Sequence, residues 1–225
     1  MKQYFVTGTD TEVGKTWVSA GLLRAAGTAG YRSLGYKPVA AGCDWVNGQW
    51  VNEDALALQQ AASVAVPVEQ INPLRFSPPI APHIAARQAG VVVEPGQIMA
   101  GFSDLAAEEH DLLLMEGAGG WRLPIGRGRF MSDVVKSLKL DVILVVGMRL
   151  GCLNHALLTA EAIKQDGLTL AGWIANTPGD GMSCYAENLA TLDELMSAPR
   201  LGEVPYAKNE KACADLLAGA VNKLI

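Results

Sequence analysis

Short apolar runs alternate along the chain with longer stretches that are amphipathic or rich in alanine. The apolar runs predict strands at 3–7, 34–39, 111–115, 141–147 and 168–175, with a shorter strand at 201–204. Hydrophobic residues within these runs are nearly continuous instead of alternating with polar ones. Such runs are typical of strands that are covered on both faces.

The stretches between these runs predict helices at 15–26, 53–62, 81–88, 96–109, 131–138, 152–165 and 185–196. Strands that alternate with helices favour right-handed crossovers and a mostly parallel sheet with helices on both faces, the α/β class. The chain shows no repeat, low-complexity linker or break in composition, so we expect a single domain over residues 1–225. Four prolines precede Pro82 in the segment 65–82, which we expect to be an ordered surface excursion.

Composition narrows the possible classes of function. The net charge of -5 argues against a general nucleic-acid or membrane-surface binder, which would display a basic patch. The four cysteines are scattered without a C-x-x-C pair, which favours reduced thiols in a reducing cytosol. The sequence shows no secretory leader and no apolar run of the roughly 18 to 20 residues that span a bilayer. We therefore expect a cytoplasmic enzyme or binding protein.

A phosphate-binding motif lies between the first predicted strand and the first predicted helix. Gly8, Gly14, Lys15 and Thr16 fit the pattern G-x-x-x-x-G-K-[ST]. In this motif, backbone N–H groups surround the β-phosphate and the lysine reaches the β- and γ-phosphate oxygens. The Thr16 hydroxyl is then a ligand for Mg²⁺. The motif predicts binding of a nucleoside triphosphate.

Two acidic residues are candidates for the same metal site. Glu116 ends the apolar run LLLM, and a carboxylate at the end of a buried strand needs a partner because burying it alone is costly. The alternative is an exposed acid at the strand end. Asp54 opens a predicted helix, where an acidic residue is also common for reasons of helix capping alone.

Lys37 and Asn176 each allow two interpretations. Lys37 ends the second predicted strand, and could be an edge residue that extends its ammonium to solvent. If the strand is central, the ammonium would instead lie near Lys15 and neutralise charge on a transferred phosphoryl group. Asn176 suits the edge of an adenine, but equally suits a turn before Thr-Pro-Gly. The three histidines show no ligand spacing, and we expect them to be structural.

An ordered set of segments across almost the whole chain resembles the dethiobiotin synthetases: YFVTGTDTEVGKT, GYKPVAAG, NEDALALQ, EGAGGW, ILVVGMRLGCLNHALLTAEAI, LAGWIAN and LGEVP. The resemblance implies a homodimeric P-loop enzyme that uses ATP and Mg²⁺. Members convert 7,8-diaminopelargonate and CO₂ into the ureido ring of dethiobiotin during biotin biosynthesis, through a carbamate and a carbamic-phosphoric anhydride.

The resemblance also implies roles for individual residues. Mg²⁺ would be held by Thr16, Asp54 and Glu116, and the catalytic groups would be Lys15, Lys37 and Thr11. Nucleotide contacts are implied for Glu12, Val13, Gly14, Lys15, Thr16, Trp17, Asp54, Glu116, Gly117, Ala118, Gly119, Asn176, Thr177, Pro205, Tyr206 and Ala207. The substrate would contact Glu12 and Ala41, and its carboxylate would bind the helix start of the partner chain at Gly151, Cys152, Leu153 and Asn154.

One position departs from the family pattern. The family commonly has Lys-Pro-Val-Ala-Ser-Gly, and Ala41 stands here in place of the serine. The missing hydroxyl removes one hydrogen bond to the substrate, worth roughly 1 kcal/mol net. This change bears on substrate affinity and not on the type of reaction.

Asp10 and Glu12 are unexpected in a loop that binds a polyanion. Related partition and cell-division ATPases have a K-G-G-x-G-K-T loop, and Asp10 stands where their first lysine would be. Our hypothesis is that Asp10 points away from the phosphates and that Glu12 faces the diamine; the alternative is that both are merely solvated. Either way these acids argue against the rival interpretation, a switch ATPase. A second rival, a cobyrinate synthase, needs a glutaminase domain for which 225 residues leave no room.

Overall fold

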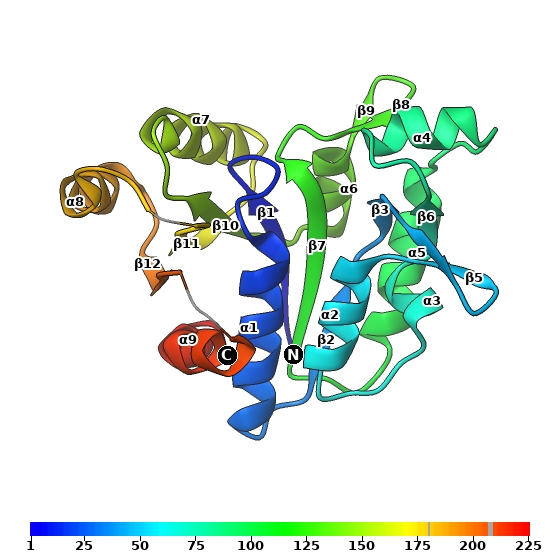
Figure 1. The fold of residues 1–225 in the computed structure, drawn as a ribbon, viewed down its shortest axis with the longest axis horizontal. Helices are drawn as coiled ribbons and strands as arrows, with labels where there is room; N and C mark the ends of the chain where they lie inside the picture. Colours follow the sequence, from blue (N-terminus) through cyan, green and yellow to red (C-terminus); the bar gives the residue numbers. More distant parts are fainter. Residues whose placement is uncertain (180, 207–208) are drawn as a thin grey trace.

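The computed structural model describes residues 1–179, 181–206 and 209–225. Its centre is a parallel sheet with the strand order β12-β11-β10-β1-β7-β2 (Figure 1). The strands are β1 (Lys2–Gly8), β2 (Ser33–Tyr36), β7 (Leu112–Gly120), β10 (Asp141–Gly147), β11 (Leu170–Asn176) and β12 (Arg200–Val204). All five pairings are parallel, as the continuous apolar runs predict.

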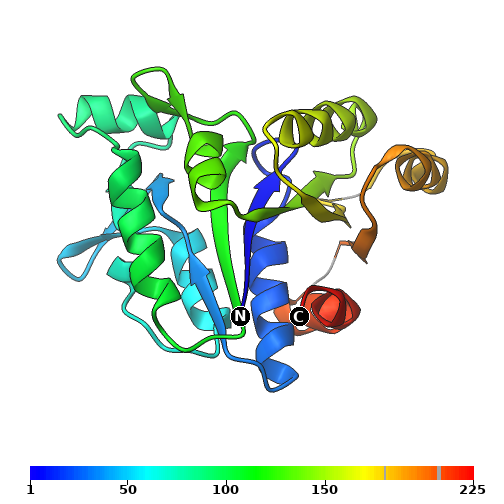
Figure 2. The same cartoon turned by 180° about the vertical axis from the view of Figure 1, so that it is seen from behind.

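Helices cover both faces of this sheet. On one face lie α1 (Lys15–Thr28), α2 (Glu53–Ala61) and α9 (Glu210–Leu224). The opposite face carries α5 (Pro95–Ala106) and α6 (Met131–Leu138), which lie in front of the sheet in Figure 2. The remaining long helices, α7 (Cys152–Gln165) and α8 (Tyr185–Leu195), pack beside β10 and β11.

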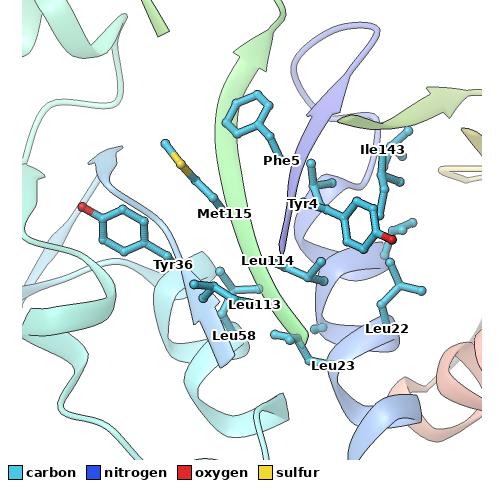
Figure 3. Packing of buried hydrophobic residues seen from close by; sticks show 14 of the residues in the cluster. Tyr4, Phe5, Leu22, Leu23, Tyr36, Leu58, Leu113, Leu114, Met115 and Ile143 are labelled. Atoms are coloured by element: carbon cyan, nitrogen blue, oxygen red, sulfur yellow. The ribbon is translucent and has the colours of Figure 1, made fainter. Parts of the chain in front are cut away.

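Successive side chains along each strand of the main sheet point to opposite faces, as residues 35 and 36 of β2 show. Tyr36 reaches away from α1, because its hydroxyl donates to the carbonyl of Ile98 in α5 at 2.9 Å. The next residue back, Gly35, faces the other way, and a Cβ there would lie 3.0 Å from Leu58 and 3.1 Å from Leu23. Figure 3 shows Leu22, Leu23 and Leu58 gathered around this side of the strands. Glycine at 35 therefore lets α1 and α2 approach the sheet closely.

The second predicted strand ends earlier than expected. It stops at Tyr36 instead of 39, since Pro38 has no N–H to donate to a neighbouring strand. The chain then leaves the main sheet and forms β3 (Val39–Ala41), which pairs with β6 (Leu74–Phe76). Because β2 is an edge strand, Lys37 does not end a central strand.

Several smaller elements complete the fold, and the sequence patterns did not predict all of them. The proline-rich segment contains the short helix α3 (Val68–Ile71) and β6, and it leads into α4 (Pro82–Gln88). Two hairpins are formed by β4 (Asp44–Val46) with β5 (Gln49–Val51) and by β8 (Pro124–Gly126) with β9 (Arg129–Phe130). The C-terminal helix α9 was also not predicted. None of the helices in the described residues has the length and apolar character needed to cross a bilayer.

Candidate active site

The phosphate loop joins the end of β1 to the start of α1. Gly14, just before the helix, has a φ of 84°, and a Cβ there would lie 2.2 Å from the amide nitrogen of Asn176. Only glycine fits this position. The first N–H groups of an α-helix have no partner within the helix, which makes the start of α1 suitable for a phosphate.

Lys15 is buried beneath the loop. Its exposed fraction is 7%, and its ammonium donates to the carbonyl of Asp10 at 2.9 Å. Burial and, to a smaller extent, the nearby charge of Lys37 lower the pKa of Lys15 to about 8, although Glu116 and Asp54 oppose the shift. A phosphate bound in the loop would therefore stabilise the protonated form of Lys15.

A buried cluster of charges connects this loop to β7 and α2. The ammonium of Lys37 lies 2.6 Å from Oε1 of Glu116 and 3.1 Å from Oδ2 of Asp54. The hydroxyl of Thr16 donates to the same Glu116 oxygen at 2.8 Å. Glu116 is fully buried, so the alternative of an exposed strand-end acid is wrong. Lys37 is also buried, although it follows an edge strand.

The ion pairs fix the protonation states of Lys37 and Asp54. Burial alone would lower the pKa of Lys37, but attraction to Glu116 and Asp54 outweighs it and raises the pKa above the ordinary value for lysine. Burial alone would raise the pKa of Asp54, but Lys37 and the Thr16 hydroxyl hold it below the usual range. Lys37 is thus a stable cation, and Asp54 a stable anion, at neutral pH.

The cluster has the chemistry of a magnesium site. Oε2 of Glu116 is buried and has no hydrogen-bond partner in the described residues. A bound cation would satisfy this oxygen, with Thr16 and Asp54 as further oxygen ligands. The described residues contain no group of three or more His, Cys, Asp or Glu that could hold a metal. Two carboxylates and a hydroxyl are nevertheless typical of Mg²⁺, which completes its shell with water and substrate phosphates.

A cleft of about 770 Å³ lies over the loop and the charge cluster. It brings together most of the residues to which we assigned catalytic, metal or phosphate roles. Its far wall is apolar and was not predicted: it is made by 79–82 and Leu123. The cleft is lined by Thr11, Glu12, Gly14, Lys15, Thr16, Lys37, Ala40, Ala41, Gly42, Asn52, Glu53, Asp54, Pro79, Ile80, Ala81, Pro82, Ala118, Gly119 and Leu123.

The two loop acids have different surroundings. Asp10 accepts a hydrogen bond from the N–H of Thr11 at 2.8 Å, and its other oxygen lies 2.8 Å from the guanidinium of Arg149. Its carboxylate is therefore directed to the loop between β10 and α7. Glu12 is exposed, lines the cleft and has a φ of 58°. Sequence reasoning assigned no role to Arg149, although this residue lies in the segment ILVVGMRLGCLNHALLTAEAI.

The predicted adenine contacts lie at the other side of the loop. Asn176 is buried and donates to the carbonyl of Val13 at 2.8 Å, so it also supports the loop. Trp17 borders a smaller depression of about 320 Å³ beside the start of α9, where Glu210 forms an ion pair with Arg24. Pro205 and Tyr206 follow β12 and are exposed, whereas Ala207 lies outside the described residues.

The predicted carboxylate site at the start of α7 is separate from the cleft in one chain. Gly151 has a φ of 96°, Cys152 is buried, and Asn154 is exposed. None of the residues 151–154 is among those found to line the cleft. One chain alone therefore does not unite this helix start with Lys37.

Several solved structures have a fold similar to that of this chain. The cell-division protein MinD of Aquifex aeolicus matches with a TM-score of 0.61 at 13% identity, over 100% of this chain and 96% of that one. A ParA family ATPase of Chlorobium tepidum matches with a TM-score of 0.58 at 13% identity, over 99% and 91% of the two chains. Identities this low establish the P-loop fold and nothing about activity.

Comparison of sequences identifies the family of this chain more specifically than comparison of folds does. A family model described as an AAA domain matches residues 2–212. The ATP-dependent dethiobiotin synthetase BioD of Alteromonas mediterranea is 59% identical over 92% of this chain and 93% of its own. The proteins of the same name from Pseudomonas aeruginosa UCBPP-PA14 and Vibrio vulnificus YJ016 are 53% and 48% identical, over 91% and 94% of this chain and 90% and 92% of theirs. With matches of this extent, the chain belongs to the ATP-dependent dethiobiotin synthetase family.

Proposed function

We propose that this chain closes the ureido ring of dethiobiotin from 7,8-diaminopelargonate and CO₂, using ATP and Mg²⁺, as a step of biotin biosynthesis. Membership of the family supports the reaction. The observation in the structure that supports it best is the buried Lys37 ammonium, held between Glu116 and Asp54 in the cleft that the phosphate loop also lines. A second cation beside the loop lysine suits transfer of a phosphoryl group to an anionic acceptor.

The proposed reaction proceeds in three steps. One amine of the substrate adds to CO₂ and loses a proton, which gives a carbamate. A carbamate oxygen then attacks the γ-phosphorus of ATP, and ADP leaves. Finally the second amine attacks the carbonyl of the mixed anhydride and loses a proton, the ring closes, and inorganic phosphate leaves.

The residues of the charge cluster are assigned complementary roles. Thr16, Asp54 and Glu116 would hold Mg²⁺, which shields the charge of the triphosphate. Lys15 and Lys37 would stabilise the negative charge on the carbamate and on the phosphoryl group while the phosphoryl group is transferred. Thr11, Ala118 and Gly119 line the same cleft, and the hydroxyl of Thr11 would donate a hydrogen bond to the carbamate.

The substrate end of the cleft fits an aliphatic diamine. Glu12 offers a carboxylate that can attract an ammonium, and the apolar wall at 79–82 can contact methylene groups. Ala41 lines the cleft without a hydroxyl. We also propose a homodimer in the cytoplasm, in which the start of α7 from one chain binds the substrate carboxylate at the cleft of the other.

The first prediction is that ATP turnover depends on both co-substrates. We expect phosphate release to be at least about 10-fold faster with diaminopelargonate and bicarbonate than with MgATP alone, because only the carbamate is a good acceptor. A coupled phosphate assay together with detection of dethiobiotin measures this. Equal rates with and without the diamine, and no dethiobiotin, would support a switch ATPase instead.

The second prediction concerns Glu12. Glu12→Gln should raise the KM for the diamine about 5- to 10-fold with little change in affinity for ATP, since it removes the charge that attracts the ammonium. Steady-state kinetics give the first quantity, and calorimetric titration with a non-hydrolysable ATP analogue gives the second. Asp10→Asn is the matched control, since the Asp10 carboxylate is directed to Arg149. Tighter ATP binding without an effect on the diamine would mean that Glu12 only repels phosphate.

A further inference from the structure

Lys37 occupies an irregular stretch of backbone. It follows the last residue of the edge strand β2, and Pro38 after it cannot donate a backbone hydrogen bond. The ladder to β7 ends at Tyr36, paired with Met115, so the main sheet does not fix the peptide groups of Lys37. Some other contact must hold them, because a buried carbonyl or N–H needs a partner.

The segment from α3 to β6 supplies these contacts. The N–H of Lys37 donates to the carbonyl of Ile71 at 2.8 Å. The carbonyl of Lys37 accepts a hydrogen bond of 2.6 Å from the side-chain amide of Asn72. One residue further, the N–H of Leu74 donates to the carbonyl of Pro38 at 3.1 Å. Of these three contacts, only that of Asn72 comes from a side chain.

Asn72 is placed for this contact and makes no other with its side chain among the described residues. It is fully buried, and its own N–H ends the short helix α3 by donating to the carbonyl of Val68 at 2.8 Å. Its Oδ1 is buried and has no hydrogen-bond partner in the part of the chain that the structure describes. Asn72 is also absent from the residues found to line the cleft, so it does not touch the substrates directly.

We propose that Asn72 is a positioning residue for Lys37 in the reaction proposed above, on which this inference rests. Its amide fixes the orientation of the Lys37 carbonyl, and with it the direction in which the Lys37 side chain leaves the backbone. That direction places the ammonium between Glu116 and Asp54. Loss of the amide lets the peptide rotate, and the charge no longer meets the phosphoryl group in the transition state.

The test compares kcat with KM. Asn72→Ala should lower kcat for dethiobiotin formation by about 10- to 100-fold, because small displacements of a catalytic group have effects of this size. The KM for ATP should change less than about twofold, since the phosphate loop is untouched. Tyr36→Phe is the matched control. Tyr36 precedes Lys37 in the chain, and this substitution removes another buried hydrogen bond from a side chain to a backbone carbonyl. That bond joins Tyr36 to Ile98 and does not involve Lys37.

A double-mutant cycle shows whether Asn72 acts through Lys37. In the Lys37→Ala background, Asn72→Ala should lower the single-turnover rate less than about twofold, because the charge that it positions is gone. If Asn72→Ala does not yield folded protein, Asn72→Leu replaces it, as leucine fills a similar volume and lacks the donor. The proposal is overturned if kcat falls no further than in Tyr36→Phe, or if it falls equally in both backgrounds. Formation of dethiobiotin by the unaltered enzyme tests the function separately.

Discussion

Replacing Lys37 by alanine is expected to lower kcat about 100- to 1,000-fold, a range typical for removal of a single group that stabilises transition-state charge. The KM for ATP should change less than about threefold, because the loop and Lys15 supply most of the ground-state contacts to the phosphates. Lys15→Ala, by contrast, should weaken ATP binding and lower turnover together. Steady-state rates and calorimetric titration with a non-hydrolysable analogue distinguish the two patterns.

The same substitution has a structural effect that must be separated from catalysis. Removing Lys37 leaves the fully buried Glu116 without its cationic partner, and breaking a buried pair in this way typically costs about 3–5 kcal/mol. Lys37→Met keeps most of the side-chain volume and serves as a second variant. The rate of each variant must therefore be divided by its folded fraction, which thermal unfolding with and without Mg²⁺ measures. An unchanged kcat would mean that Lys37 only balances the charge of Glu116.

The central sheet and the loop were predictable because their signals are local. Strands buried on both faces have continuous apolar runs, as 141–147 shows, and Gly14, Lys15 and Thr16 are adjacent in a motif whose spacing is set by the phosphate. Glu116 was identified for the same reason, because it directly follows the apolar run LLLM. The helix α9 also carried a local signal that was overlooked. Its buried Cys213, Leu217 and Leu224 recur at helical spacing after Asn209, which caps the helix.

The remaining features depend on contacts between distant segments. Arg149 and Asp10 are 139 residues apart, and a pair of exposed charges leaves no periodic signal in a sequence. Asn72 and Lys37 are 35 residues apart, and their contact exists because β2 ends at Tyr36. Pro38 marked that end, and its effect on the strand could have been recognised from sequence. The buried position of Lys37 could not, because β2 is an edge strand and an edge lysine is ordinarily solvated.

A second large effect is expected if two chains share each active site. The cleft of one chain contains the loop and Lys37, whereas the predicted carboxylate site at 151–154 does not line that cleft. Leu150 directly precedes this helix start and Leu158 lies in the middle of α7, with exposed fractions of 94% and 56%. A dimer that covers these leucines would be consistent with the proposal that the helix start serves the partner's cleft.

Complementation between two inactive variants tests this arrangement. The first variant is Lys15→Ala, which disables the phosphate loop. The second is Asn154→Glu, which adds a carboxylate at the helix start where the substrate carboxylate would bind. Asn154 is preferable to Gly151 for this purpose, because Gly151 has a φ of 96° and any side chain there would strain the backbone. Gln165→Glu, at the far end of α7, is the control for an added charge.

Mixing the two inactive variants should restore activity only if each active site is formed by residues of both chains. In a mixed dimer both lesions then fall in one site, and the other combines an intact loop with an intact helix start. Random exchange of equal amounts gives about half mixed dimers, each with one active site, so about a quarter of the wild-type activity should return. If each chain instead used its own helix start, every site would carry one lesion. No activity would then return, despite verified exchange of subunits.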